Sequence, residues 1–129
     1  MTNKGLRAVL LWGPPLVYMG VIFYASGLSN PPDVGPDVSA HFIEYLVLGA
    51  LFARAIGGGV RGVQRRVALI AWLGCVLYGA SDEFHQSFVP RRQCELKDLW
   101  MDSLGGAAGA ALLWTLAVRL GQREGGIAS

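Results

Sequence analysis

The residues best suited to chemistry are acids and histidines that recur at helical spacing in two stretches of the chain. His41 and Glu44 are three positions apart, and so are Asp82 and His85. Residues three apart share one face of a helix, so each pair places an imidazole beside a carboxylate. Histidine carries protons near neutral pH, and carboxylates orient it or exchange protons with it. The pairs therefore indicate general acid/base chemistry, with His41, Glu44, Asp82, Glu83 and His85 as candidate catalytic residues.

The same pairs are also suited to metal binding. Imidazole and carboxylate ligands on facing helices hold metal ions in helix bundles, and this mixture of ligands suits zinc or manganese. The cofactor prediction is therefore left open at a divalent metal, with candidate ligands His41, Glu44, Asp82 and His85. The alternative is a hydrogen-bonded network that fixes helix register and does no chemistry.

Two arginines follow the second pair closely. The planar guanidinium of arginine binds phosphate through two parallel hydrogen bonds. We expect Arg92 to bind a phosphate and Arg91 to contact lipid headgroups. The candidate substrate-binding residues are this arginine and polar residues near or along the same helical faces: Tyr45, Gln86, Arg92, Asp98 and Asp102.

Membrane helices must position these residues. The chain has 129 residues, of which 53% are hydrophobic and 16% charged, which is typical of an integral membrane protein. A net charge of +2 with scattered Lys and Arg excludes a nucleic-acid groove, which requires a basic face. The apolar runs predict one all-α domain, residues 1–129, a bundle of four transmembrane helices at about 8–27, 38–56, 66–86 and 99–120.

Two of the apolar runs are too short to cross a membrane alone. Residues 45–53 and 67–80 are uncharged, but a span of about 30 Å of hydrocarbon requires about 20 helical residues. Each helix must therefore continue into its polar neighbours, which places His41, Glu44 and residues 82–86 at the membrane boundary. Charged groups at that depth turn toward the interior of the bundle. The sequence thus predicts one polar site shared by several helices.

The orientation follows from the basic residues. Of the 11 Lys and Arg, only Arg91, Arg92 and Lys97 lie in the first and third connections, and the rest lie at the termini or in the second connection. Because basic residues are enriched on the cytoplasmic side, both termini are predicted to be cytoplasmic and the polar site extracytoplasmic.

The first apolar run has a second interpretation. Residues 25–27, Ala-Ser-Gly, resemble a signal-peptide cleavage site. We expect the run to be retained as a membrane helix, bent or loosened at Pro14 and Pro15.

Small residues in the last apolar run allow close helix contact. Gly105 and Gly109 are four positions apart, a spacing that lets two helix backbones approach. This face is expected to pack against the other polar helices, and it is also the surface through which we expect any oligomer to form.

A set of motifs then suggests a family. The motifs are Asp37-x-x-x-His41-Phe42-x-x-Tyr45, then Tyr78-Gly79-x-x-Asp82-Glu83-x-His85-Gln86-x-Phe88-Val89-Pro90-x-Arg92, then Asp98 and Gly105 or Gly106. They resemble the VanZ-like membrane proteins, which implies a multi-pass protein of the bacterial inner (cytoplasmic) membrane with relatives linked to low-level teicoplanin resistance. The chain departs from the family at Arg91, where Gly is usual, and at Asp102, where Asn is usual.

Two functions of different classes fit these features. The first is action on, or binding of, a phosphate-bearing lipid-linked cell-envelope precursor at the outer leaflet, with membrane lipids as further partners. The second is a non-enzymatic accessory or binding protein whose polar cluster is structural. Whether the protein is an enzyme is left open, and a transporter is less favoured because no inverted repeat is visible.

Overall fold

The computed structural model describes residues 3–29, 37–92 and 95–127 and contains no strand among them. All four α-helices are long and apolar enough to cross a membrane, which confirms the predicted all-helical architecture. The side on which the termini lie stays a prediction. The elements are α1 (Asn3–Ser26), α2 (Asp37–Ile56), the short 3₁₀ helix η1 (Val60–Gly62), α3 (Arg65–Gln86) and α4 (Leu96–Ile127).

Several helices extend beyond the apolar runs from which their bounds were predicted. Both α2 and α3 continue through their polar ends, as the required span length predicted. α4 is longer than predicted at both ends, so Asp98 lies in its first turn, where the helix dipole favours a carboxylate. α1 also begins earlier than predicted and runs through Pro14 and Pro15 without interruption.

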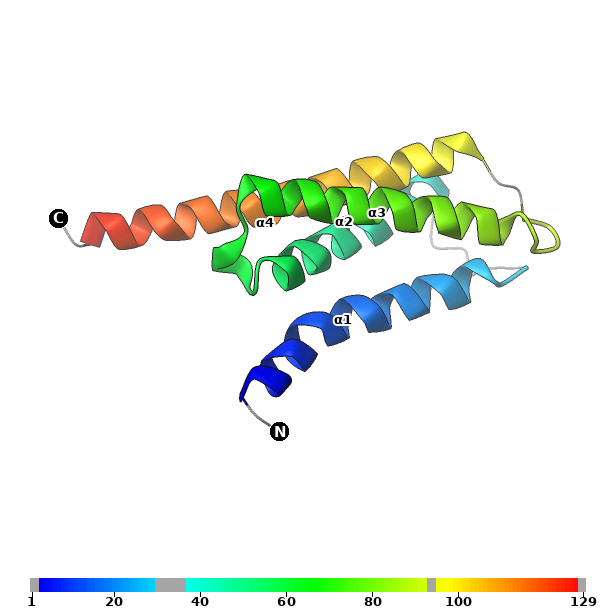
Figure 1. Ribbon diagram of the computed structural model, residues 1–129. Coiled ribbons are helices and arrows are strands. Elements are labelled where there is room, and N and C mark those ends of the chain that lie inside the picture. The colour runs from blue at the N-terminus through cyan, green and yellow to red at the C-terminus, as the bar shows by residue number, and fades with distance from the viewer. Residues whose placement is uncertain (1–2, 30–36, 93–94, 128–129) are drawn as a thin grey trace.

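Helices α2, α3 and α4 form the packed centre of the bundle, and the α2–α4 contact is the most extensive (Figure 1). α1 lies along one side against α2 and α3 and diverges from them toward its own beginning (Figure 1). α1 begins and α4 ends at the same end of the bundle. We call it the basic end, because most of the Lys and Arg residues lie near the termini and in the second connection. The opposite end, where α3 ends and α4 begins, is called the polar end.

Two glycines explain how closely α2 and α4 approach. Gly105 and Gly109 are buried on α4. A Cβ atom at Gly105 would overlap the backbone carbonyl of Phe42, and one at Gly109 would overlap that of Leu46. The predicted packing of this face inside the chain is confirmed. An oligomer through the same face would have to displace α2.

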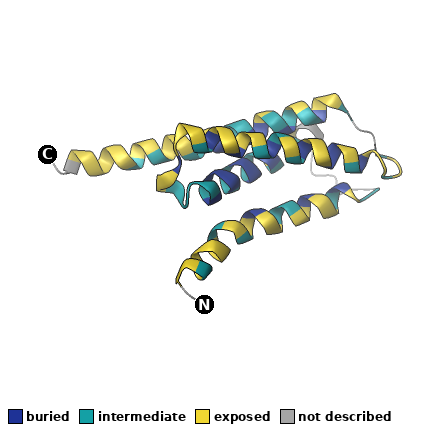
Figure 2. Ribbon diagram, viewed as in Figure 1, coloured by how far each residue is buried: buried dark blue, intermediate teal, exposed yellow. Residues whose placement is uncertain are grey.

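Most of the outer surface is apolar. Figure 2 shows buried positions along the facing sides of the helices and exposed positions around the outside. Large apolar side chains such as Leu10, Phe84 and Trp100 are more than half exposed on that outer side. Such a surface fits a bundle surrounded by lipid, with charged groups gathered inside at the polar end.

Candidate functional site

The centre of the polar end is an imidazole held by two carboxylates of one helix. His41 of α2 places Nδ1 2.8 Å from Oδ1 of Asp102 on α4. Asp98, one turn earlier on α4, has Oδ2 3.8 Å from Nε2 of the same ring. The Asp102 side chain is fully buried, and that of His41 is 12% exposed. A carboxylate at each ring nitrogen fixes the orientation of the imidazole.

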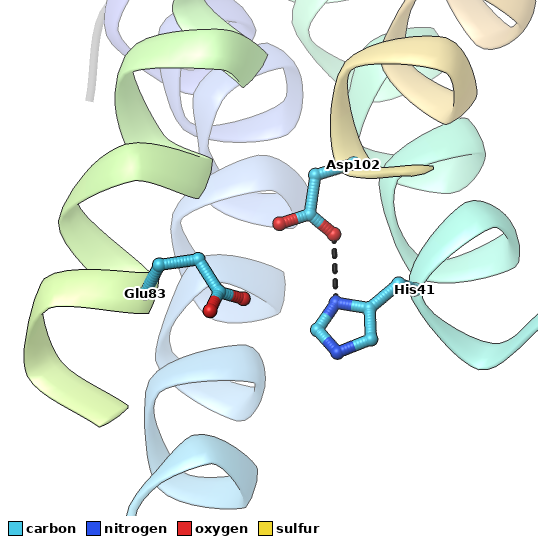
Figure 3. Close-up of side chains that lie close together, drawn as sticks. All are labelled: His41, Glu83 and Asp102. Atoms are coloured by element: carbon cyan, nitrogen blue, oxygen red, sulfur yellow. Dashed lines mark hydrogen bonds and ion pairs between the residues drawn. The ribbon is translucent and has the colours of Figure 1, made fainter. Parts of the chain in front are cut away.

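A third carboxylate approaches this pair from α3. Figure 3 shows the Glu83 carboxylate directed toward the His41 ring, with Asp102 above both. One ligand atom from each of these three side chains lies within 4.8 Å of the other two. Glu83 is only 3% exposed, yet neither of its oxygens has a hydrogen-bond partner among the described residues. Oδ2 of Asp102 also has no such partner within this part of the chain. Unpaired buried oxygens are unfavourable, so this arrangement requires an explanation.

A glycine gives the cluster its space. A Cβ atom at Gly79 of α3 would lie 3.2 Å from Oδ2 of Asp102 and 3.4 Å from Cε1 of Tyr45. The missing side chain thus lets Asp102 approach α3. Tyr45 is itself fully buried, with its ring 6.4 Å from that of Tyr78, so it packs as part of the core beside the cluster.

Asp82 belongs to a neighbouring group that joins α1 to α3. Its Oδ1 accepts a hydrogen bond from the Ser26 hydroxyl, and its Oδ2 accepts one from Nε2 of Gln86 at 3.3 Å. All three side chains are buried. Ser26 was not among the predicted site residues. In the sequence it belongs to the Ala-Ser-Gly segment that resembles a signal-peptide cleavage site. Its only signal was a hydroxyl at the polar end of an apolar helix.

The remaining predicted residues contact α1 or lie beside the cluster. The His85 ring stacks on Phe23 with centroids 4.3 Å apart. Arg92 donates from Nε to the Leu28 carbonyl at 2.8 Å and from Nη2 to the Ala25 carbonyl at 3.0 Å. These bonds satisfy carbonyls at the end of α1. Phosphate binding by Arg92 therefore stays a prediction, with two of its nitrogens bound to α1 here.

The predicted metal ligands are only partly brought together. Of the four candidates, His41 lies in the described three-residue group, whereas Glu44, Asp82 and His85 lie outside it. Glu44 is half-buried and near enough to His41 to interact with it electrostatically. Spacing along one helix predicted pairs within α2 and within α3, but the group is built across α2, α3 and α4. Glu83, predicted as catalytic, and Asp102, predicted as substrate-binding, take the other two positions.

The structure shows the surroundings of the two residues at which the chain departs from the VanZ-like motifs, Arg91 and Asp102. Arg91 has φ of 65°, the left-handed region that glycine adopts without strain, so the Gly that the resemblance implies at this position would fit the backbone. Asp102 accepts its hydrogen bond from His41 through one oxygen, as the amide oxygen of an Asn would. The second oxygen of Asp102 adds a negative charge that an Asn would not carry.

Comparison with known proteins gives the family. The model of the VanZ/LLP1 family matches residues 38–118, which is more than half of the chain. Neither the curated proteins nor the solved structures contain a match to this chain. The chain belongs to the VanZ/LLP1 family, and the resemblance found in its motifs is confirmed.

Proposed function

We propose that this member of the VanZ/LLP1 family is a membrane enzyme that acts on a phosphate-bearing, lipid-linked precursor of the cell envelope. Its reactive centre is formed by His41, Glu83 and Asp102. The observation that carries the proposal is Glu83, which is buried without a hydrogen-bond partner in the described part of the chain and faces an oriented imidazole. A cluster that only held helices together would satisfy its own polar atoms. Ionisable groups left uncompensated at membrane depth are typical of functional sites.

The three side chains have distinct roles in this proposal. His41 is the proton carrier, and Asp102 holds its ring through the 2.8 Å contact to Nδ1. Glu83 is the second proton-exchanging group, and its carboxylate approaches the imidazole from a different helix, to within 4.8 Å. Asp82 and Gln86 support the site from beside it, since Asp82 accepts hydrogen bonds from Ser26 at the end of α1 and from Gln86 on α3.

The choice of a lipid-linked substrate rests on where the centre lies. The cluster lies at one end of helices whose outer faces are apolar, so a substrate with its tail in the bilayer would place its phosphate at the same depth. Arg91 and Arg92 follow α3 at this end and supply positive charge for a phosphate. We place this end on the extracytoplasmic side on the basis of the basic residues in the connections. A change in teicoplanin susceptibility is the cellular effect that the family resemblance implies.

The proposal is tested by following the precursor itself. Purified protein is incubated in liposomes with extracted lipid-linked precursors, and the lipids are analysed by mass spectrometry. We expect the unaltered protein to change the mass of a precursor and His41→Asn to leave it unchanged, because the amide can hydrogen-bond Asp102 but cannot carry a proton. Glu124→Gln, an exposed acid at the basic end, is the matched control and should behave as the unaltered protein.

Two results would contradict the enzyme proposal. One is the absence of any mass change with the unaltered protein. The other is an equal rate of conversion by His41→Asn. In cells that contain equal amounts of each protein, His41→Asn should change teicoplanin susceptibility relative to the unaltered protein. Glu124→Gln should not.

A non-enzymatic accessory function is the second candidate, and one observation favours it. Part of the polar end is structural, because Asp82 bonds to Ser26 and Arg92 bonds to carbonyls of α1. If the whole cluster served this purpose, loss of function in its variants would follow loss of folded protein. Measuring the abundance and melting temperature of each variant together with its function separates the two candidates.

A further inference from the structure

The reactive centre contains more acidic than basic groups. Glu83, Asp98 and Asp102 are all buried around the single imidazole of His41. Such an excess of carboxylates is unfavourable at membrane depth unless protonation or a positive charge offsets it. The same excess would repel the phosphate of the proposed substrate. A positively charged group inside the centre would remove both difficulties.

We infer that His41, Glu83 and Asp102 bind a divalent metal ion, with zinc or manganese as the expected class. The three side chains come from three helices and converge on one point (Figure 3), with ligand atoms within 4.8 Å of one another. Both oxygens of Glu83 and Oδ2 of Asp102 have no hydrogen-bond partner among the described residues, so lone pairs are available at the centre. One imidazole with two carboxylates suits these two metals.

The geometry is close to what such an ion requires. Ligand atoms around a tetrahedral ion at about 2.0–2.2 Å are separated from one another by about 3.4 Å. The three ligand atoms lie within 4.8 Å of one another, so side-chain rotations that move them about 1 Å closer together would bring them to binding distance. Three protein ligands leave further positions on the ion open, as in catalytic metal sites.

This inference rests on the proposed function and concerns the same centre, but it changes two roles: with the ion bound, His41 and Glu83 serve as its ligands in place of the proton-carrying roles given above. The bound ion would neutralise negative charge and accept a phosphate oxygen of the substrate. Metal binding can be measured without any substrate, which keeps the two proposals separable.

The test uses untagged, chelator-treated protein in detergent. The protein is titrated with Mn²⁺ or Zn²⁺ alone, and the heat of binding is measured by isothermal titration calorimetry. We expect one ion per chain. Glu83→Gln and Asp102→Asn should each weaken binding at least about tenfold, because each removes a charged oxygen ligand. Two variants are used so that, if one of them does not fold, the affinity of the other still tests the site. Glu124→Gln should bind as the unaltered protein does.

The inference is overturned if the unaltered protein binds neither ion, or if both cluster variants bind with its affinity. Metal binding without conversion of the precursor would support the inference and count against the proposed function. Conversion by chelator-treated protein that binds no ion would overturn the inference and leave the proposed function standing.

Discussion

The two ends of the bundle each contain an ion pair between distant parts of the chain, but in opposite surroundings. At the basic end, the side chains of Arg61 and Glu124 are 67% and 61% exposed. At the polar end, those of His41 and Asp102 are 12% and 0% exposed. An exposed pair contributes about 0–1 kcal/mol, whereas charges buried in a membrane protein are expensive and commonly functional. The difference supports our proposal that the functional chemistry lies at the polar end.

The ends are similar in how they hold α1, the helix with the fewest contacts to α4. Arg54 donates from Nη1 to the Leu10 carbonyl at the basic end. Arg92 donates to the Ala25 and Leu28 carbonyls at the polar end. Arginines thus attach both halves of α1 to the bundle through its backbone. Arg7 of α1 also donates to the Gly58 carbonyl at the basic end, so the two ends have equal numbers of these bonds, and those at the polar end are less exposed.

The largest effect is expected from filling the close contact near the cluster. Gly105→Ala would place a Cβ against the Phe42 carbonyl, and backbone atoms cannot move aside as side chains do. We expect a loss of about 1–3 kcal/mol or more, with α4 displaced from α2 and the His41–Asp102 contact broken. The melting temperature in detergent measures this loss.

The control for that variant lies on the same helix at the basic end. Gly121→Ala adds a Cβ that meets nothing within 4 Å, so its melting temperature should stay the same or rise slightly through better helix propensity. Equal melting temperatures for Gly105→Ala and Gly121→Ala would show that the close packing of α2 and α4 is wrong.

A smaller effect is expected from detaching α1. Arg92→Ala removes two charge-assisted hydrogen bonds in a partly buried setting and should lower stability by about 1–2 kcal/mol. Arg54→Ala removes one exposed bond and should cost less than about 1 kcal/mol. Thermal unfolding of the two variants side by side checks the order. A larger loss of stability for Arg54→Ala than for Arg92→Ala would contradict the expectation that α1 is held more strongly at the polar end.

Much of the fold could be predicted from composition and length. The four spans, the helical continuation through His41 and Gln86, and the packing of the Gly105 face all follow from the membrane thickness and from small-residue spacing. The beginning of α1 and both ends of α4 were predicted too short, because the helices continue beyond the apolar residues into more polar ones.

The grouping within the site could be predicted only in part. Helical spacing placed His41 beside Glu44 and Asp82 beside His85, because it describes one helix at a time. Which side chain of α3 reaches α2 depends on helix rotation, and the structure selects Glu83. The contacts of Arg92 with α1 likewise depend on how α1 packs, for which the apolar pattern has no signal.

The central claim is that the polar cluster exists for function at the expense of stability. Glu83→Gln tests it most directly, because it retains the shape of the side chain and removes a buried carboxyl group whose oxygens have no hydrogen-bond partner in the described part of the chain. We predict that the chelator-treated variant melts at the same or a higher temperature than the chelator-treated unaltered protein, whereas with metal restored only the unaltered protein converts the precursor. A lower melting temperature, with conversion reduced only in proportion to folded protein, would contradict the account.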